Sequence, residues 1–331
     1  MPEVLVATPL NYSAATRPYN FADGISIREI SPILWDISVV KGYVSAADKT
    51  KMDEAKYWIC ASKECEYVLP QTGDELYTKA RNAALALQVI SPSGAMHVFL
   101  KFQRTDNGYD NIGALHLKEL CRTRLGKLMS AEKLGLEKDF EAVYAGISRA
   151  FTEKVVRFQN PVILLEQGMQ TGHVSLGTLM FVMGLDMIFM AGGIDNFMKR
   201  LGGFLGVDSY VFPPVSSLDI QPNTRVRDVL NELYEFRNII AHGLEIPETP
   251  YRQKIDLIST EGQRINYEDY YRRELLLDSA LFLLTTSLRR IFIEDLFDEV
   301  KDLGKWKVKM SLYEHRYKEA GGPEVNKQHG R

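Results

Sequence analysis

An arginine, an asparagine and a histidine lie close together near residue 240, and the three could act together on a phosphate group. Arg237 and Asn238 are adjacent, and His242 follows Asn238 by four residues. Four residues are about one helical turn, so Asn238 and His242 would share a face if this segment is a helix. An imidazole exchanges protons near neutral pH, and a guanidinium is a permanent cation. The trio therefore predicts a site that binds or cleaves a phosphodiester.

The element that must position this trio is an amphipathic helix. Apolar residues recur along the segment at three- and four-residue spacing, namely Leu230, Leu233, Phe236, Ile240 and Ala241. Asn223 and Thr224 are the expected N-terminal caps of this helix. Gly243 is the expected residue just beyond its C-terminal end, because glycine adopts the left-handed conformation at little cost.

A purely structural interpretation of the same residues stays open. A histidine in the last turn of a helix interacts favourably with the negative end of the helix dipole, whatever its chemistry. An arginine four to six residues before a histidine is also a loose pattern. However, none of the other five histidines has an arginine at that spacing, and the single match falls at the end of a predicted helix.

The composition is that of a globular protein without an overall positive charge. The chain has 331 residues, 45% of them hydrophobic, and a formal net charge of −3, so we expect two domains and only local patches for nucleic acid. The three cysteines lack the spacing of a zinc site, and their odd, sparse number favours a reducing compartment. We therefore expect a cytoplasmic protein with no metal, no cofactor and no DNA partner.

One apolar stretch, residues 174–194, is nearly long enough to span a bilayer. Asp186 would then lie near the bilayer centre at a cost of about 3 kcal/mol. Four glycines dilute the stretch further, and no second span accompanies it. We expect the buried core helix of a bundle and no membrane partner. Residues 1–18 also lack the charged start and apolar core of a signal peptide.

The organisation along the chain predicts an α+β fold with two domains. Residues 1–125 read as a mixed α/β domain, which could serve as a sensor or regulator. Its expected elements are strands at 33–40, 97–104 and 112–117 and a helix at 74–90. The last two strands would form a hairpin joined by a longer loop at Asn107-Gly108.

Residues 126–300 predict an all-α helical bundle. Besides the helix that carries the trio, its expected helices are 139–157, broken at Asn160-Pro161, then 179–190, 195–206 and 267–300, with residues 246–264 irregular. The segment Lys199-Arg200-Leu201-Gly202-Gly203 resembles a phosphate loop only superficially, because no strand precedes it. Residues 301–331 carry eight Lys/Arg against four Asp/Glu and predict a polar, mildly basic, frayed tail.

The C-terminal half resembles the HEPN family of helical domains ("higher eukaryotes and prokaryotes nucleotide-binding"), and in particular its Apea-like branch of bacterial defence and stress proteins. The resemblance rests mainly on Arg237-Asn238-Ile239-Ile240-Ala241-His242-Gly243, which Leu233-Tyr234 precedes. It extends to an upstream apolar helix with one acidic residue, Asp186, where the family more often has glutamate. The basic segment from Lys199 to Gly206 also fits, and the whole resemblance covers roughly residues 138–298.

The resemblance implies a metal-independent endoribonuclease that acts on RNA as a homodimer, with the motif helices of two subunits forming one cleft. His242 would be the general acid/base when a ribose 2′-hydroxyl attacks the adjacent phosphorus. Arg237 would stabilise charge on the phosphoryl oxygens, and Asn238 would orient the phosphate or the histidine. The expected products are a 2′,3′-cyclic phosphate and a 5′-hydroxyl.

Two other interpretations compete with the ribonuclease. In the first, the bundle is a non-catalytic HEPN-like module that dimerises or recognises a nucleotide or protein partner, and the trio is a capped helix end. The exposure of His242 separates these two, because an enzyme needs Arg237 and His242 open to solvent. In the second, the chain is the helical partner of a nucleotidyltransferase, which is disfavoured because such partners are usually short stand-alone chains.

Overall fold

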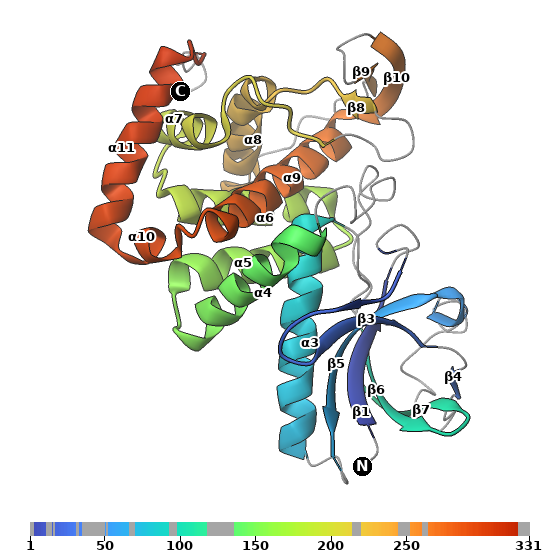
Figure 1. Ribbon diagram of the computed structural model, residues 1–331. Helices are drawn as coiled ribbons and strands as arrows, with labels where there is room; N and C mark the ends of the chain where they lie inside the picture. The colour runs from blue at the N-terminus through green and yellow to red at the C-terminus, as the bar shows by residue number, and fades with distance from the viewer. Residues whose placement is uncertain are drawn as a thin grey trace. The chain divides into compact units, whose positions relative to one another are not determined.

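The computed structural model shows an α+β chain with two compact units (Figure 1). The first unit holds Met1–Arg122 and Gly126–Ser148, and the second holds Thr123–Leu125 and Arg149–Arg331. The structure describes residues 3–10, 15, 17–30, 33–34, 50, 52–65, 70–92, 98–117, 136–213, 220–243, 252–259 and 264–323.

The first unit is built on a seven-stranded sheet in the order β2-β3-β5-β1-β6-β7-β4. Its neighbouring strands pair antiparallel, except that β4 and β7 pair parallel. The strands are β1 (Glu3–Pro9), β2 (Tyr19–Asn20), β3 (Ile25–Glu29), β4 (Ile33–Leu34), β5 (Tyr57–Glu64), β6 (Val98–Thr105) and β7 (Gly108–Leu117). Helix α3 (Pro70–Ile90) lies along β1 and β5, as Figure 1 shows.

The sequence located the main elements of this unit but not their details. Helix α3 and strand β6 confirm the predictions for residues 74–90 and 97–104. The longer loop expected after β6 is wrong, because Thr105 pairs with Gly108 and only two residues lie between them. Gly108 has φ +136°, which a side chain would disfavour. Most of the strand predicted at 33–40 lies outside the described residues.

Helix α4 (Leu136–Thr152) belongs mainly to the sheet unit, whereas the sequence placed it in the bundle. The Phe140 ring stacks on Phe21 with centroids 4.1 Å apart. The Tyr144 hydroxyl donates to the Asp23 carboxylate at 3.1 Å, and Lys79 of α3 lies 2.8 Å from the same carboxylate. The helical pattern alone could not show which core α4 joins, since its apolar stripe suits either.

The second unit is a bundle around helix α6. Its helices are α5 (Val156–Gln170), α6 (Val174–Phe189), α7 (Ile194–Leu205), α8 (Val226–Ala241), α9 (Arg272–Ile293), α10 (Phe297–Lys301) and α11 (Leu303–Glu319). The break between α4 and α5 falls at residues 153–155 rather than at Asn160-Pro161, and Pro161 lies inside α5. At the break Lys154 adopts φ +54°, which ends the first helix.

The glycines of α6 let its neighbours approach closely. A Cβ at Gly177 would lie 2.9 Å from the Leu277 side chain of α9, and one at Gly184 would lie 3.1 Å from Leu284. The expectation of a core helix is confirmed over its buried face, which includes Phe181 and Leu185. No single helix in the described ranges is long and apolar enough to cross a membrane, and α6 and α7 meet that criterion only as a pair bent by 78°.

Two features correct the prediction of an all-α bundle with a frayed tail. A three-stranded sheet lies in this unit, in the order β10-β9-β8, with β8 at Ile220–Pro222, β9 at Arg252–Ser259 and β10 at Arg264–Tyr271. Accordingly α9 begins at Arg272 rather than at residue 267. The segment predicted to be irregular contains strand β9. The backbone groups of β9 pair with the antiparallel strands β8 and β10, and a local sequence pattern does not show such pairing.

The segment predicted to be a frayed tail forms helix α11 and packs on α7. Its buried side chains recur at helical spacing and are Trp306, Met310, Tyr313 and Tyr317. A Cβ at Gly203 would lie 1.8 Å from the Tyr313 carbonyl oxygen, and one at Gly202 would lie 2.8 Å from the Tyr317 ring. The two glycines of α7 therefore allow close packing of α7 against α11. This packing explains the Gly202-Gly203 pair without a phosphate-binding loop.

Candidate functional site at the end of helix α8

Helix α8 presents the trio at its C-terminal end. The Arg225 backbone N–H donates to the Asp228 carboxylate at 2.8 Å, so the cap lies just after the predicted Asn223-Thr224. At the other end the His242 backbone N–H donates to the Asn238 carbonyl at 3.0 Å. Gly243 has φ +63° and donates to the Ile240 carbonyl at 3.1 Å, which confirms its predicted place just beyond the helix.

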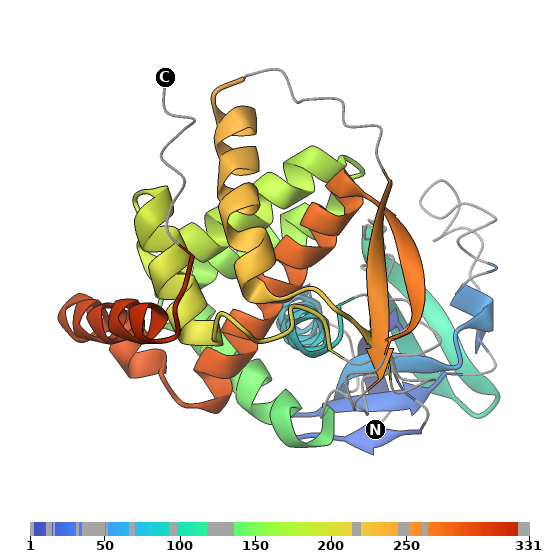
Figure 2. The ribbon, with the colours of Figure 1, turned by 90° about the horizontal axis from the view of Figure 1, so that it is seen from above.

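The last turn of α8 extends beyond the core of its unit. The buried side chains of this helix end at Phe236, and Ala241, His242 and Gly243 are all exposed. Figure 2 shows this end of α8 at the edge of the bundle. Helix α8 is thus anchored through its buried residues up to Phe236, while Arg237 and Asn238 are partly exposed and His242 is exposed.

Arg237 makes more side-chain contacts with described residues than the other two members of the trio. One terminal nitrogen donates to the Asn238 side-chain oxygen at 2.9 Å, and the other lies 3.4 Å from the Asp186 carboxylate of α6. Its guanidinium also lies over the Tyr234 ring, 5.4 Å from the centroid. The Arg237 side chain is 25% exposed and the Asp186 side chain 19% exposed. These three contacts hold the guanidinium in one orientation without burying it.

The guanidinium keeps unused donors in that orientation. Arginine has five N–H groups, and two of them are used by Asn238 and Asp186. The Nε group is buried and has no hydrogen-bond partner among the described residues. Among the described residues, each terminal nitrogen thus keeps one N–H without a partner, and such donors suit the oxygens of a phosphate or carboxylate.

Asp186 joins the site to the turn that ends α6. Its second carboxylate oxygen accepts from the Gly192 backbone N–H at 3.2 Å. Its carbonyl accepts from the backbone N–H groups of Met190 and Ala191. Met190 adopts φ +49° and Gly192 φ +61°, so this is a left-handed turn that needs such contacts. Asp186 also affects Tyr234, whose pKa is raised by burial and by the carboxylate, against the opposing charge of Arg237.

His242 stands apart from the other two side chains. Its imidazole is exposed and makes no hydrogen bond to any residue that the structure describes. Its backbone N–H donates to the carbonyls of Asn238 and Ile240 in the last turn of α8. The structure thus brings Arg237 and Asn238 into direct contact, adds Asp186, and leaves the imidazole open. An open imidazole can exchange a proton with a bound molecule.

Sequence reasoning missed one residue of the site and had no basis for another. Tyr234 lies three residues before Arg237, the helical spacing that places a ring beside a guanidinium, and this signal was available. The side chain of Arg200, in the adjacent helix α7, donates to the carbonyls at the end of α6, and no local pattern in the sequence predicts this contact. Among the described residues there is also no group of three or more His, Cys, Asp or Glu that could hold a metal ion.

Comparisons of the chain with protein-family models, with curated proteins and with solved structures found no match. The resemblance to the HEPN family therefore rests only on the residues quoted for it in the sequence.

Proposed function

We propose that this protein is a HEPN-type, metal-independent endoribonuclease that serves as a defence or stress effector, with Arg237, Asn238 and His242 as its catalytic residues. The observation that carries the proposal is an oriented guanidinium, with two N–H groups that no described residue uses, on the same helix end as an exposed imidazole. The proposed fold is a sensor or regulatory unit followed by a HEPN-like bundle that forms a homodimer.

In the proposed reaction, His242 accepts the proton of a ribose 2′-hydroxyl. The 2′-oxygen then attacks the adjacent phosphorus, and the bond from phosphorus to the 5′-oxygen breaks. A proton returns to that leaving oxygen, which leaves a 5′-hydroxyl and a 2′,3′-cyclic phosphate. Arg237 neutralises the charge that develops on the non-bridging oxygens. The Asn238 amide nitrogen has no protein partner among the described residues, so it can donate to the same phosphate.

The experiment that tests this proposal is cleavage of a labelled structured RNA in EDTA. The parent is compared with His242→Ala and Arg237→Ala, and with His315→Ala as a control, because His315 is an exposed histidine of α11 that pairs with Glu319. We expect His242→Ala to lose at least about 10²-fold in rate, the usual contribution of acid–base catalysis. We expect a loss of about 10²-fold or more in Arg237→Ala from the lost charge stabilisation, and a cyclic-phosphate end in the parent product. If both site variants fold and cleave like the parent, the assignment is wrong.

A second candidate is a non-catalytic module that binds a nucleotide or a protein partner. No hydrogen bond among the described residues joins the imidazole to the side chains of Arg237 and Asn238, which favours this candidate, because these two side chains could bind an anion without His242. This candidate predicts that the parent binds RNA oligonucleotides without cleaving them. It also predicts that Arg237→Ala weakens binding while His242→Ala leaves it nearly unchanged. Light scattering of the same samples would measure the dimer that both candidates imply.

A further inference from the structure

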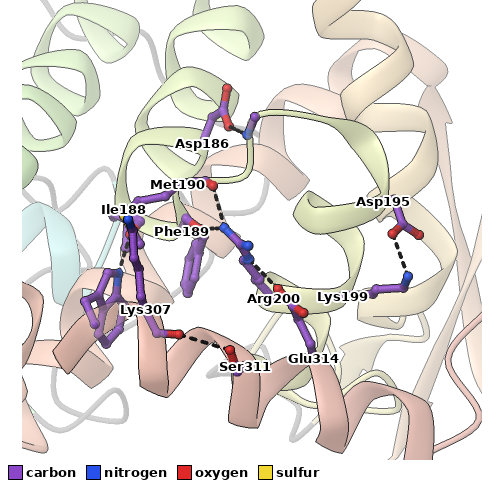
Figure 3. Close-up of polar contacts among 12 residues, drawn as sticks. Asp186, Ile188, Phe189, Met190, Asp195, Lys199, Arg200, Lys307, Ser311 and Glu314 are labelled. Atoms are coloured by element: carbon purple, nitrogen blue, oxygen red, sulfur yellow. Dashed lines mark hydrogen bonds and ion pairs between the residues drawn. The ribbon is translucent and has the colours of Figure 1, made fainter. Parts of the chain in front are cut away.

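The C-terminal end of α6 is completed by side chains from two other helices. The last carbonyls of a helix lack partners within it and need donors from elsewhere. The Trp306 indole of α11 donates to the Ile188 carbonyl at 2.7 Å. One terminal nitrogen of Arg200 in α7 donates to the carbonyls of Phe189 at 3.2 Å and Met190 at 2.5 Å. Figure 3 shows Arg200 extended toward this helix end.

Arg200 is itself held by the C-terminal helix. Its Nε donates to the Glu314 carboxylate of α11 at 2.7 Å, and the two side chains are 19% and 28% exposed. A guanidinium is planar and serves several acceptors at fixed angles, which a lysine cannot do. Helix α11 therefore contributes to the end of α6 in two ways, directly through Trp306 and indirectly through Glu314 and Arg200.

The turn that Arg200 holds is the turn that positions Asp186. Arg200 binds the Met190 carbonyl, and the Met190 backbone N–H donates to the Asp186 carbonyl. Two residues later the Gly192 N–H donates to the Asp186 carboxylate, whose other oxygen pairs with Arg237. A continuous series of polar contacts thus runs from Glu314 through Arg200 and Asp186 to the guanidinium of the proposed site.

We infer that Arg200 is a positioning residue for Arg237, and that the docking of α11 sets the orientation of the guanidinium through Glu314 and Arg200. The catalytic consequence rests on the proposed ribonuclease function, whereas the structural coupling does not. A displacement of α11 would release the left-handed turn, rotate the Asp186 carboxylate and free Arg237. The segment that resembles a simple basic tail in sequence would thereby control the site.

The coupling is tested by NMR of side-chain Nε–H groups in ¹⁵N-arginine-labelled protein, with the Arg237 signal assigned by its loss in Arg237→Lys. The informative variants are Arg200→Gln, which removes all three bonds, and Glu314→Gln, which weakens only one. Lys199→Gln is the matched control, since Lys199 lies next to Arg200 but pairs with Asp195 within α7. Arg200→Lys tests whether a point charge alone restores the signal.

We expect the Arg237 signal to shift or broaden in Arg200→Gln, to shift less in Glu314→Gln and in Arg200→Lys, and to stay unchanged in Lys199→Gln. In RNA cleavage, we expect Arg200→Gln to lower kcat about tenfold or more with KM within about twofold, as for a misplaced catalytic group. An unchanged Arg237 signal in folded Arg200→Gln overturns the inference. If that variant does not fold, an unchanged signal in Glu314→Gln overturns it. A parent that cleaves no RNA contradicts the proposed function, while the NMR signal still decides the coupling.

Discussion

Replacing Gly203 by alanine tests the packing of α11 most directly. In an exposed helix interior this change stabilises a protein by up to about 1 kcal/mol, because alanine favours the helix. In α7 the new Cβ would lie 1.8 Å from the Tyr313 carbonyl oxygen and 2.5 Å from its carbonyl carbon. Both atoms belong to the backbone, so no side-chain rotation can relieve the contact.

The size of the effect follows from the movement that the contact requires. An ordinary contact distance begins near 3.4 Å, so α7 and α11 must separate by 3.4 minus 1.8, or roughly 1.6 Å. A gap of about 1 Å already forfeits up to half of the dispersion energy at an interface. Overpacking typically costs about 1–3 kcal/mol, and a backbone contact belongs at the upper end. We therefore expect the free energy of unfolding to fall by about 3 kcal/mol.

The assay is urea unfolding followed by circular dichroism, combined with ¹⁹F NMR of 5-fluorotryptophan-labelled protein. Trp306 is buried against α6, and its ¹⁹F signal, assigned with Trp306→Phe, reports whether α11 stays docked. Gly193→Ala is the control, because a Cβ there meets nothing within 4 Å. A Gly203→Ala protein as stable as the parent, with an unchanged Trp306 signal, would show that the close approach of α7 to α11 is wrong.

Two further predictions concern titrating groups. Burial raises the pKa of the Cys60 thiol from its usual 9.0 to about 12, so Cys65 should be alkylated before Cys60 at pH 8, as peptide mapping would show. Because the pKa of the Cys60 thiol is higher in the folded than in the unfolded protein, the stability that the neutral thiol contributes is complete below pH 9.0 and is lost as the pH rises toward about 12. In base titrations of the free energy of unfolding, Cys60→Ala should remove that loss. The backbone N–H groups of Lys305 and Gly304 lower the pKa of the Asp302 carboxyl below its usual 3.8. The cap therefore stabilises α11 above that pH and weakens as the pH falls, and in urea titrations Asp302→Asn should keep the cap while losing this pH dependence.

Local patterns predicted the elements that carry the site. The spacing of Leu230, Leu233 and Phe236 located α8, and Gly243 marked its end, because a helix stripe and a left-handed glycine are properties of short segments. The exposure of His242 also follows from its place beyond the last buried turn. These features depend on neighbours within one or two turns, which the sequence displays directly.

Pairings between distant segments were beyond the same reasoning. Strands β9 and β10 were missed, since only their antiparallel register satisfies their backbone groups. Helix α11 was mistaken for a frayed tail because its excess of lysine and arginine dominated the pattern. Its apolar residues Trp306, Met310, Tyr313 and Tyr317 follow helical spacing. However, Tyr313 and Tyr317 pack against a pair of glycines in α7, more than 100 residues earlier in the chain. A glycine pair in a helix usually signals instability, and only the neighbouring backbone shows why it is needed here.

Asp186 shows why the site could be named from the sequence but not understood from it. In the sequence, Asp186 is a lone acidic residue in an apolar helix, and it argues against a membrane position for α6. In the structure the same carboxylate has two partners, Gly192 and Arg237. One oxygen closes the turn after α6, and the other orients Arg237, so fold and site share a single side chain. A carboxylate beside Arg237 also weakens the attraction of this arginine for the phosphate that we propose it binds. Such an arrangement is favourable only if the orientation of the Arg237 guanidinium matters more than its full positive charge. A group that stabilises a transition state has this requirement, because it must lie where the charge develops.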